Sequence, residues 1–150
     1  MKLTDDLKDL LNGKQLAQKQ HIAMVLQSIT SEGYPHSAMV SVGEVIALDS
    51  EHLRIALWPQ TQTSISLAEK RKSNLIIIYN NMVSYLELDI TLLPSLDNEV
   101  YERTRFEATI KSIRQDIAKY ADITSGITVE MHEPEQVLNR WNIILQELLK

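Results

Sequence analysis

The chain has 150 residues, of which 44% are hydrophobic and 23% charged, and its formal net charge is −5. This size and composition are typical of one globular domain, here residues 1–150, which can bury enough surface to fold without a metal or a disulfide. The absence of cysteine excludes disulfides, cysteine-ligated metal sites and thiol nucleophiles. The excess of acidic over basic residues argues against nucleic acid as a partner. The apolar runs are too short to cross a membrane. We therefore expect a cytoplasmic protein.

The first segment of the chain has the pattern of a short amphipathic helix. Thr4 is a suitable N-cap, and Asp5 and Asp6 follow it in the first turn, where carboxylates interact favourably with the helix dipole. Gly13 is placed to end the helix. The apolar positions repeat at helical spacing and are Leu3, Leu7, Leu10 and Leu11.

Four runs typical of β-strands follow, at 23–30, 36–42, 44–48 and 53–58. The turn between the first two runs contains Gly33 and Pro35 and predicts a hairpin. The remaining links are too short to hold crossover helices, so we expect these strands to pair in an antiparallel manner.

The middle of the chain predicts a helix over 61–72 and two further strands. The helix begins with hydroxyl side chains and ends with the basic run 70–72, which agrees with the direction of its dipole. An almost wholly apolar run at 74–79 predicts a central strand, and Asn80-Asn81 predicts a turn into a strand over 83–93. The segment 94–103 has no clear pattern.

The last third of the chain predicts two more strands and a closing helix. Phe106, Ala108 and Ile110 alternate with polar residues, which indicates a strand with one buried and one solvent-exposed face. A connector over 116–126, with room for one helical turn, leads to an alternating run at 127–131 that predicts a last strand. Pro134 can occupy the first turn of the closing helix, whose apolar stripe consists of Val137, Leu138, Trp141, Ile144, Leu145 and Leu148.

Together these elements predict a mainly β, α+β fold. We expect a small closed or partly closed barrel of about six antiparallel strands, with one inserted helix and a helix at each end. A two-sheet sandwich is the competing architecture. No internal repeat or linker divides the chain, which agrees with a single domain.

Most motifs that carry catalytic chemistry are absent from the sequence. There is no G-x-S-x-G nucleophile elbow, no P-loop and no G-x-G-x-x-G. The histidines stand alone, without the spacing of metal ligands, so we expect no metal site. These histidines are His21, His36, His52 and His132.

One junction between a predicted strand and a predicted helix is more specific. The strand ends with Leu57-Trp58-Pro59, and Thr61-Gln62-Thr63-Ser64 opens the helix. Free amide donors, the positive end of the helix dipole and neighbouring hydroxyls suit an anion such as a phosphate. The same hydroxyls are also common N-caps, and the residues alone leave both interpretations open.

Two stretches of the sequence resemble the pyridoxamine 5'-phosphate oxidase-like FMN-binding split-barrel family. They read GYPHSAMVSV at 33–42 and LRIALWPQTQTS at 53–64, and the apolar strand from Asn74 follows them as it does in that family. The segment 116–127 also resembles the late connector of one branch of small members. The resemblance extends from about Ala23 to Tyr85 and implies a split β-barrel.

The same resemblance implies where a cofactor would bind. Ser37, Met39 and Ser41 would lie beside the flavin ring, and Leu57 and Trp58 would lie at the end of the neighbouring strand. Thr61, Gln62 and Thr63 would stand where the FMN phosphate binds. The oxidase itself typically has arginine and lysine at the phosphate, whereas the matching positions here hold Ala38, Gly43, Gln62 and Thr63.

The function that the resemblance implies is that of an FMN-binding oxidoreductase-like protein acting on an unidentified small molecule. Family members form homodimers in which the partner closes the cofactor site. Because the flavin does the redox chemistry, no catalytic triad is required. Two alternatives stay open: a non-catalytic split-barrel binding module that has lost FMN, and a split barrel that uses another planar cofactor such as a deazaflavin or haem.

Overall fold

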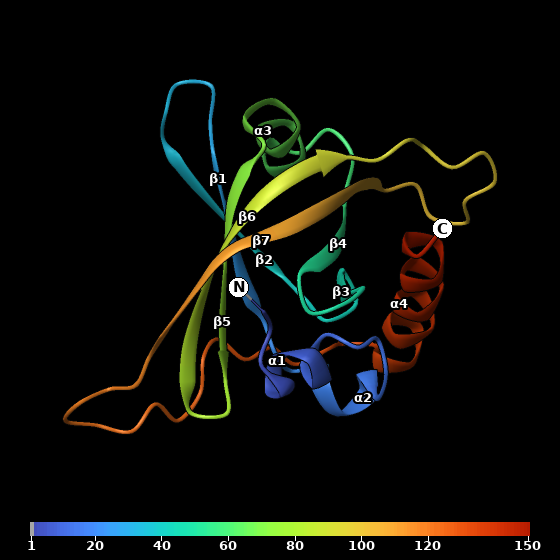
Figure 1. Cartoon of the computed structure of the whole chain (residues 1–150). Coiled ribbons are helices and arrows are strands. Elements are labelled where there is room, and N and C mark those ends of the chain that lie inside the picture. Colours follow the sequence, from blue (N-terminus) through green and yellow to red (C-terminus); the bar gives the residue numbers. More distant parts are fainter. Residues whose placement is uncertain (1) are drawn as a thin grey trace.

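The computed structural model describes residues 2–150, and one curled antiparallel sheet forms its centre (Figure 1). Its strands are β1 (Met24–Ile29), β2 (Pro35–Val40), β3 (Val45–Ala47), β4 (His52–Leu57), β5 (Lys72–Tyr79), β6 (Met82–Leu92) and β7 (Thr104–Asp116). They are ordered β2-β1-β5-β6-β7-β4-β3 across a seven-stranded sheet, and every pair is antiparallel. This confirms the split-barrel α+β prediction and excludes the sandwich.

In the described part of the chain, four helices accompany the sheet. They are α1 (Asp5–Leu10), α2 (Leu16–Lys19), α3 (Gln62–Lys70) and α4 (Pro134–Leu148). The inserted helix α3 packs against β1 and β2 at one end of the sheet, while α4 packs beside β4 (Figure 1). No helix among residues 2–150 is long and apolar enough to span a bilayer.

The core fills the inner side of the curled sheet. Leu26 of β1 pairs with Leu75 of β5, which pairs with Leu86 of β6, and all three side chains are fully buried. Phe106, on the predicted inner face of β7, is also fully buried. Each such side chain contributes about 1.5–3 kcal/mol through removal of apolar surface from water, so the alternation seen in the sequence determines which face of each strand points inward.

Several helices and turns begin or end where the sequence predicts, because of interactions between residues close together in the chain. Thr4 caps α1 by accepting a hydrogen bond from Leu7 N at 3.3 Å, and Asn80 and Asn81 both adopt positive φ in the β5–β6 turn. The inserted helix ends earlier than predicted, because Arg71 takes a left-handed C-cap conformation with φ of 58°. Lys72 consequently begins β5.

The strand predicted at 127–131 is wrong. This segment forms only an isolated bridge between Ile22 and Thr128, together with hydrogen bonds from Ala23 N to Ile127 O and from Val129 N to His21 O. It has a single short neighbour, so no ladder can propagate along it. The connector before it contains no helical turn, and the segment 94–103 is a loop without helix or strand.

The short helix α2 was not predicted. It has only four residues, and Gln15 at its N-cap is left-handed and makes no side-chain capping hydrogen bond. A helix this short leaves too little periodicity to be recognised in the sequence.

The turn between β2 and β3 depends on a close contact between Gly43 and Trp141 of α4. A Cβ atom added to Gly43 would lie 2.0 Å from Trp141 Cγ. We expect Gly43→Ala to lower the free energy of unfolding by about 1–3 kcal/mol, because overpacking forces the indole ring or the turn to move. Urea denaturation followed by circular dichroism measures the loss. In a Trp141→Leu background the same change should cost less, and an equal cost in both backgrounds would contradict this explanation.

Candidate functional site

The predicted site residues come from three segments that meet at the α3 end of the sheet. The turn after β2 is joined to β4 by a hydrogen bond from Ala56 N to Glu44 O at 2.9 Å. The end of β4 runs through Trp58 into α3, and α3 packs back against β2. The end of β2 therefore lies beside the strand-to-helix junction.

The start of α3 combines a side-chain cap with free donors. Thr61 is the N-cap, since its Oγ1 accepts a hydrogen bond from Ser64 N at 3.2 Å. Gln62 is exposed and donates its side-chain amide to Ser66 Oγ at 2.7 Å, while Thr63 is buried. The backbone amides of Gln62 and Thr63 lie in the first turn, where helix geometry provides no intrahelical acceptor. Capping by Thr61 therefore leaves anion-binding groups available.

The three predicted residues of β2 differ in their environment. Ser37 and Met39 are exposed on the outer side of the strand, with 60% of Met39 accessible to solvent. Ser41 is buried in the following turn, where its backbone N–H and its hydroxyl both donate to Glu44 Oε1, at 3.0 and 2.8 Å. Only Ser37 and Met39 present their side chains on the open face.

The two residues at the end of β4 point to opposite sides. Leu57 is buried in the core, whereas 58% of Trp58 is exposed. The guanidinium carbon of Arg103 lies 3.7 Å from the centre of the Trp58 ring, within the distance of a strong cation–π contact. Trp58 is thus an exposed aromatic surface with a cation stacked on it.

Sequence reasoning missed Arg103, which comes from the 94–103 segment that showed no pattern. The pairing of β4 with β7 places Thr104 opposite Leu57 and so brings Arg103 beside Trp58. No local signal could have found this contact, because 45 positions separate the two side chains in the sequence and only the strand register joins them.

Glu44 is a second group that the sequence analysis missed. Burial raises the pKa of its carboxyl, while the hydrogen bonds from Ser41 and the charge of Arg103 act in the opposite direction. A partly buried carboxyl therefore accepts two hydrogen bonds from Ser41, one of the predicted flavin contacts.

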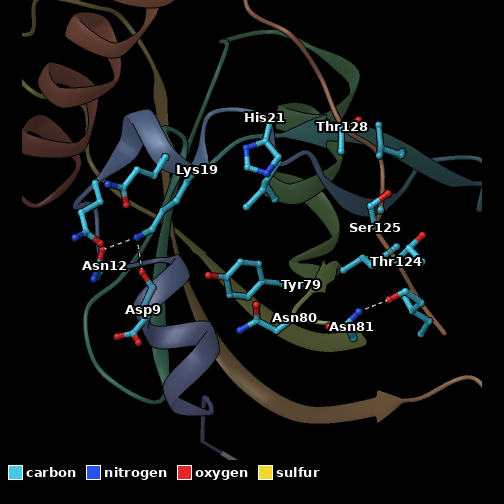
Figure 2. Close-up of a pocket in the computed structure, with 17 residues that line it drawn as sticks. Asp9, Asn12, Lys19, His21, Tyr79, Asn80, Asn81, Thr124, Ser125 and Thr128 are labelled. Carbon is cyan, nitrogen blue, oxygen red and sulfur yellow. Dashed lines mark hydrogen bonds between the residues drawn. The ribbon is translucent and has the colours of Figure 1, made fainter.

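A cavity of about 580 Å³ lies at the far end of β5 from α3 (Figure 2). Figure 2 shows Tyr79 in the middle, with Asp9, Asn12 and Lys19 on one side and Thr124, Ser125 and Thr128 on the other. We call it the Tyr79 cavity. It contains none of the predicted site residues.

The sequence is similar over almost its whole length to a bacterial protein. The uncharacterized protein YclD of Bacillus subtilis (strain 168) is 43% identical over 146 residues, which is 97% of this chain and 95% of that protein. The chain belongs to the YclD family. No family model matches it.

Several solved structures share the fold. A HupZ variant from Group A Streptococcus has a TM-score of 0.59 at 11% identity, covering 75% of this chain and 98% of that one. A candidate pyridoxamine 5'-phosphate oxidase from Lactobacillus delbrueckii has a TM-score of 0.58 at 15% identity, covering 75% and 93%. The styrene monooxygenase flavin reductase from Pseudomonas putida S12 has a TM-score of 0.50 at 14% identity, covering 66% and 81%. These likenesses confirm that the fold is that of the pyridoxamine 5'-phosphate oxidase-like split barrels.

The raised pKa of Glu44 predicts a pH-dependent stability. The folded state binds the Glu44 proton more tightly than the unfolded state, so stability from this group is full at low pH and is lost as the pH rises from about 4 through the raised pKa. Glu44→Gln removes the charge but still offers an oxygen to Ser41. We expect it to be more stable than the wild type near pH 8 and equal to it near pH 4, measured by urea denaturation at both values. A stability difference that does not change with pH would contradict this assignment.

Proposed function

We propose that the protein binds FMN at the junction of β4 and α3 and acts as an oxidoreductase on a small molecule. The observation that carries the proposal is the junction itself, where the exposed Trp58 ring leads into the start of α3 and α3 packs against β2. The motifs at 33–42 and 53–64 support it, as does the presence of a flavin reductase among proteins of the same fold. The absence of cysteine supports a cytoplasmic location.

The first turn of α3 would hold the FMN phosphate. The free amides of Gln62 and Thr63 point out of the helix start, and the helix dipole favours an anion there. Arg103 adds a cation at the same junction, which compensates in part for the absence of arginine and lysine at positions 38, 43, 62 and 63. This set of neutral donors with one guanidinium fits a phosphate.

The exposed side of β2 would lie along the flavin ring. Ser37 and Met39 would contact the ring with their side chains, and Glu44 would hold the backbone of Ser41 in place through its two hydrogen bonds. Trp58 would cover the edge of the site, and Leu57 anchors this strand end in the core. When bound, FMN supplies the hydride chemistry.

A second copy of the chain would complete this site. Val25 pairs with both Met39 and Ile76, and Ile76 pairs with Tyr85. These four side chains therefore form one row across the outer face of β2, β1, β5 and β6. The row is apolar and partly exposed, and Arg114 stacks on Tyr85 at its end, 4.2 Å from the ring centre. An apolar band on a bare sheet face suits a homodimer contact.

A split-barrel binding module that has lost FMN is the second candidate. The observation that favours it is the pair of neutral residues, Gln62 and Thr63, at the phosphate positions. Each charge-assisted hydrogen bond that is absent removes on the order of 1.5–3 kcal/mol from binding. The same module could take another planar cofactor, such as a deazaflavin or haem, and titration with FMN and riboflavin separates a flavin-binding protein from these alternatives.

We expect FMN to bind more tightly than riboflavin, because the start of α3 and Arg103 contact only the phosphate. Gln62→Glu places a negative charge beside that phosphate, so it should weaken FMN binding about tenfold and leave riboflavin binding unchanged. An acidic residue in a first turn favours the helix, so the variant should fold. Quenching of flavin fluorescence measures both affinities.

The matched control is Gln136→Glu, which adds the same charge at an exposed position in the first turn of α4. It should bind FMN as the wild type does. Equal affinities of the wild type for FMN and riboflavin would place the phosphate elsewhere, and a protein that refuses both flavins would favour the second candidate.

Met39→Lys tests the homodimer. Lysine at the β2 end of the apolar row would place a charge of each copy inside an apolar contact, so we expect the dimer to dissociate and FMN to be lost with it. Size-exclusion chromatography with light scattering gives the mass. Leu149→Lys replaces another exposed apolar side chain at the end of α4 and should leave a dimer intact. A wild-type protein that is monomeric at all concentrations would overturn this part of the proposal.

A further inference from the structure

The Tyr79 cavity is built from three separate parts of the chain. Its walls are the α1–α2 segment, the β5–β6 turn and the connector after β7 (Figure 2). The lining residues are Asp9, Asn12, Gln15, Gln18, Lys19, His21, Ile22, Ile78, Tyr79, Asn80, Asn81, Ile123, Thr124, Ser125, Gly126, Ile127 and Thr128. Its volume lies within the range of about 300–1,000 Å³ that is usual for small-molecule sites.

The connector that forms one wall is fastened on both sides. Asn81 donates its side-chain amide to Ile123 O at 2.7 Å, and the bridge between Ile22 and Thr128 ties the connector to the start of β1. Gly126 lies so close to β5 that an added Cβ would be 2.8 Å from Ile78 Cβ. These contacts make the cavity a preformed feature of the fold.

The opposite wall is held by the ammonium group of Lys19. Its Nζ donates to Asp9 O, to Asn12 Oδ1 at 2.9 Å and to Lys14 O at 2.8 Å. Its three protons are thus committed to protein oxygens, and only 7% of the residue is exposed. Lys19 therefore organises the wall and has no proton left for an anionic ligand.

The charges around the cavity also balance. Asp9 and Lys19 are its only formally charged side chains among the described residues, and they carry opposite signs. The remaining polar lining consists of amides, hydroxyls and the imidazole of His21, so a ligand with net charge would gain little from this environment.

The groups left free are suited to an uncharged ligand with many hydroxyls. Within residues 2–150, the hydroxyl of Tyr79 and the side-chain amide of Asn80 have no hydrogen-bond partner, and both lie at the middle of the view in Figure 2. Thr124, Ser125 and Thr128 add hydroxyls on the connector side. The Tyr79 ring and the isoleucines of the lining offer apolar surface to the C–H face of a sugar ring.

We propose that the Tyr79 cavity is a binding site for a neutral sugar, a monosaccharide or a disaccharide, separate from the flavin site. Its free amides and hydroxyls can both donate to and accept from sugar hydroxyls, whereas a phosphate or carboxylate would find no free cation, because Lys19 is committed to protein oxygens. The proposal does not rest on the proposed function, because none of its residues belongs to the β4–α3 junction.

The test is a titration of the purified protein with glucose, galactose, mannose, ribose, maltose and trehalose, followed through backbone amide chemical shifts. We expect at least one of these sugars to give saturable shifts confined to residues 12–22, 78–81 and 123–128. Glucose 6-phosphate, titrated alongside, should bind more weakly than glucose. Absence of saturable shifts with every neutral sugar, shifts outside these segments, or a preference for the sugar phosphate would each overturn the proposal.

Two variants locate the binding groups. Tyr79→Phe removes the hydroxyl and keeps the ring, and Asn80→Gly removes the amide while glycine readily adopts the positive φ of 51° found there. Each should weaken sugar binding about fivefold, the effect of one neutral hydrogen bond. Tyr34→Phe, at an exposed tyrosine in the β1–β2 turn, is the matched control and should bind as the wild type does. Unchanged affinity in both cavity variants would overturn the assignment even if the sugar binds.

Discussion

The simultaneous pairing of β7 with two strands is the constraint on which the rest of the fold depends. Its first half pairs with β4 and most of its length pairs with β6, so β7 joins the β3–β4 hairpin to the other four strands of the sheet. A shift in register between Glu87 and Leu88 interrupts the β6–β7 ladder, and irregularities of this kind bend a sheet. Without the β4–β7 pairing, Arg103 would not reach Trp58.

The same pairing explains why the candidate site combines residues that are far apart in the sequence. The start of α3 is local and follows directly from the end of β4. The cation at that junction is not local, because it arrives on the neighbouring strand. The junction therefore carries a positive charge, from Arg103, although residues 57–64 contain no arginine or lysine.

Elements with strong periodicity or a specific turn residue could be predicted from the sequence. Phe106 and its alternating neighbours, Thr4 as a cap and the Asn80-Asn81 turn all depend on interactions within a few residues. The run at 127–131 alternates equally well but has no ladder partner beyond a single bridge, so its pattern alone was misleading. The Tyr79 cavity could not be predicted, because three distant segments contribute to it and none of them carries a recognisable motif.

The position of α4 limits how the sheet can associate. Arg54 of β4 donates to Leu148 O, and Trp141, Ile144 and Leu148 are buried, so α4 covers the outer face on the β4 side. In the described part of the chain, the bare outer face is therefore that of β1, β2, β5 and β6. A single self-complementary face pairs with its own copy about a two-fold axis and is then used up, whereas two different faces would permit head-to-tail growth. A dimer of the kind proposed above would therefore be closed at two copies, and the covering helix would leave no second bare sheet face for open-ended growth.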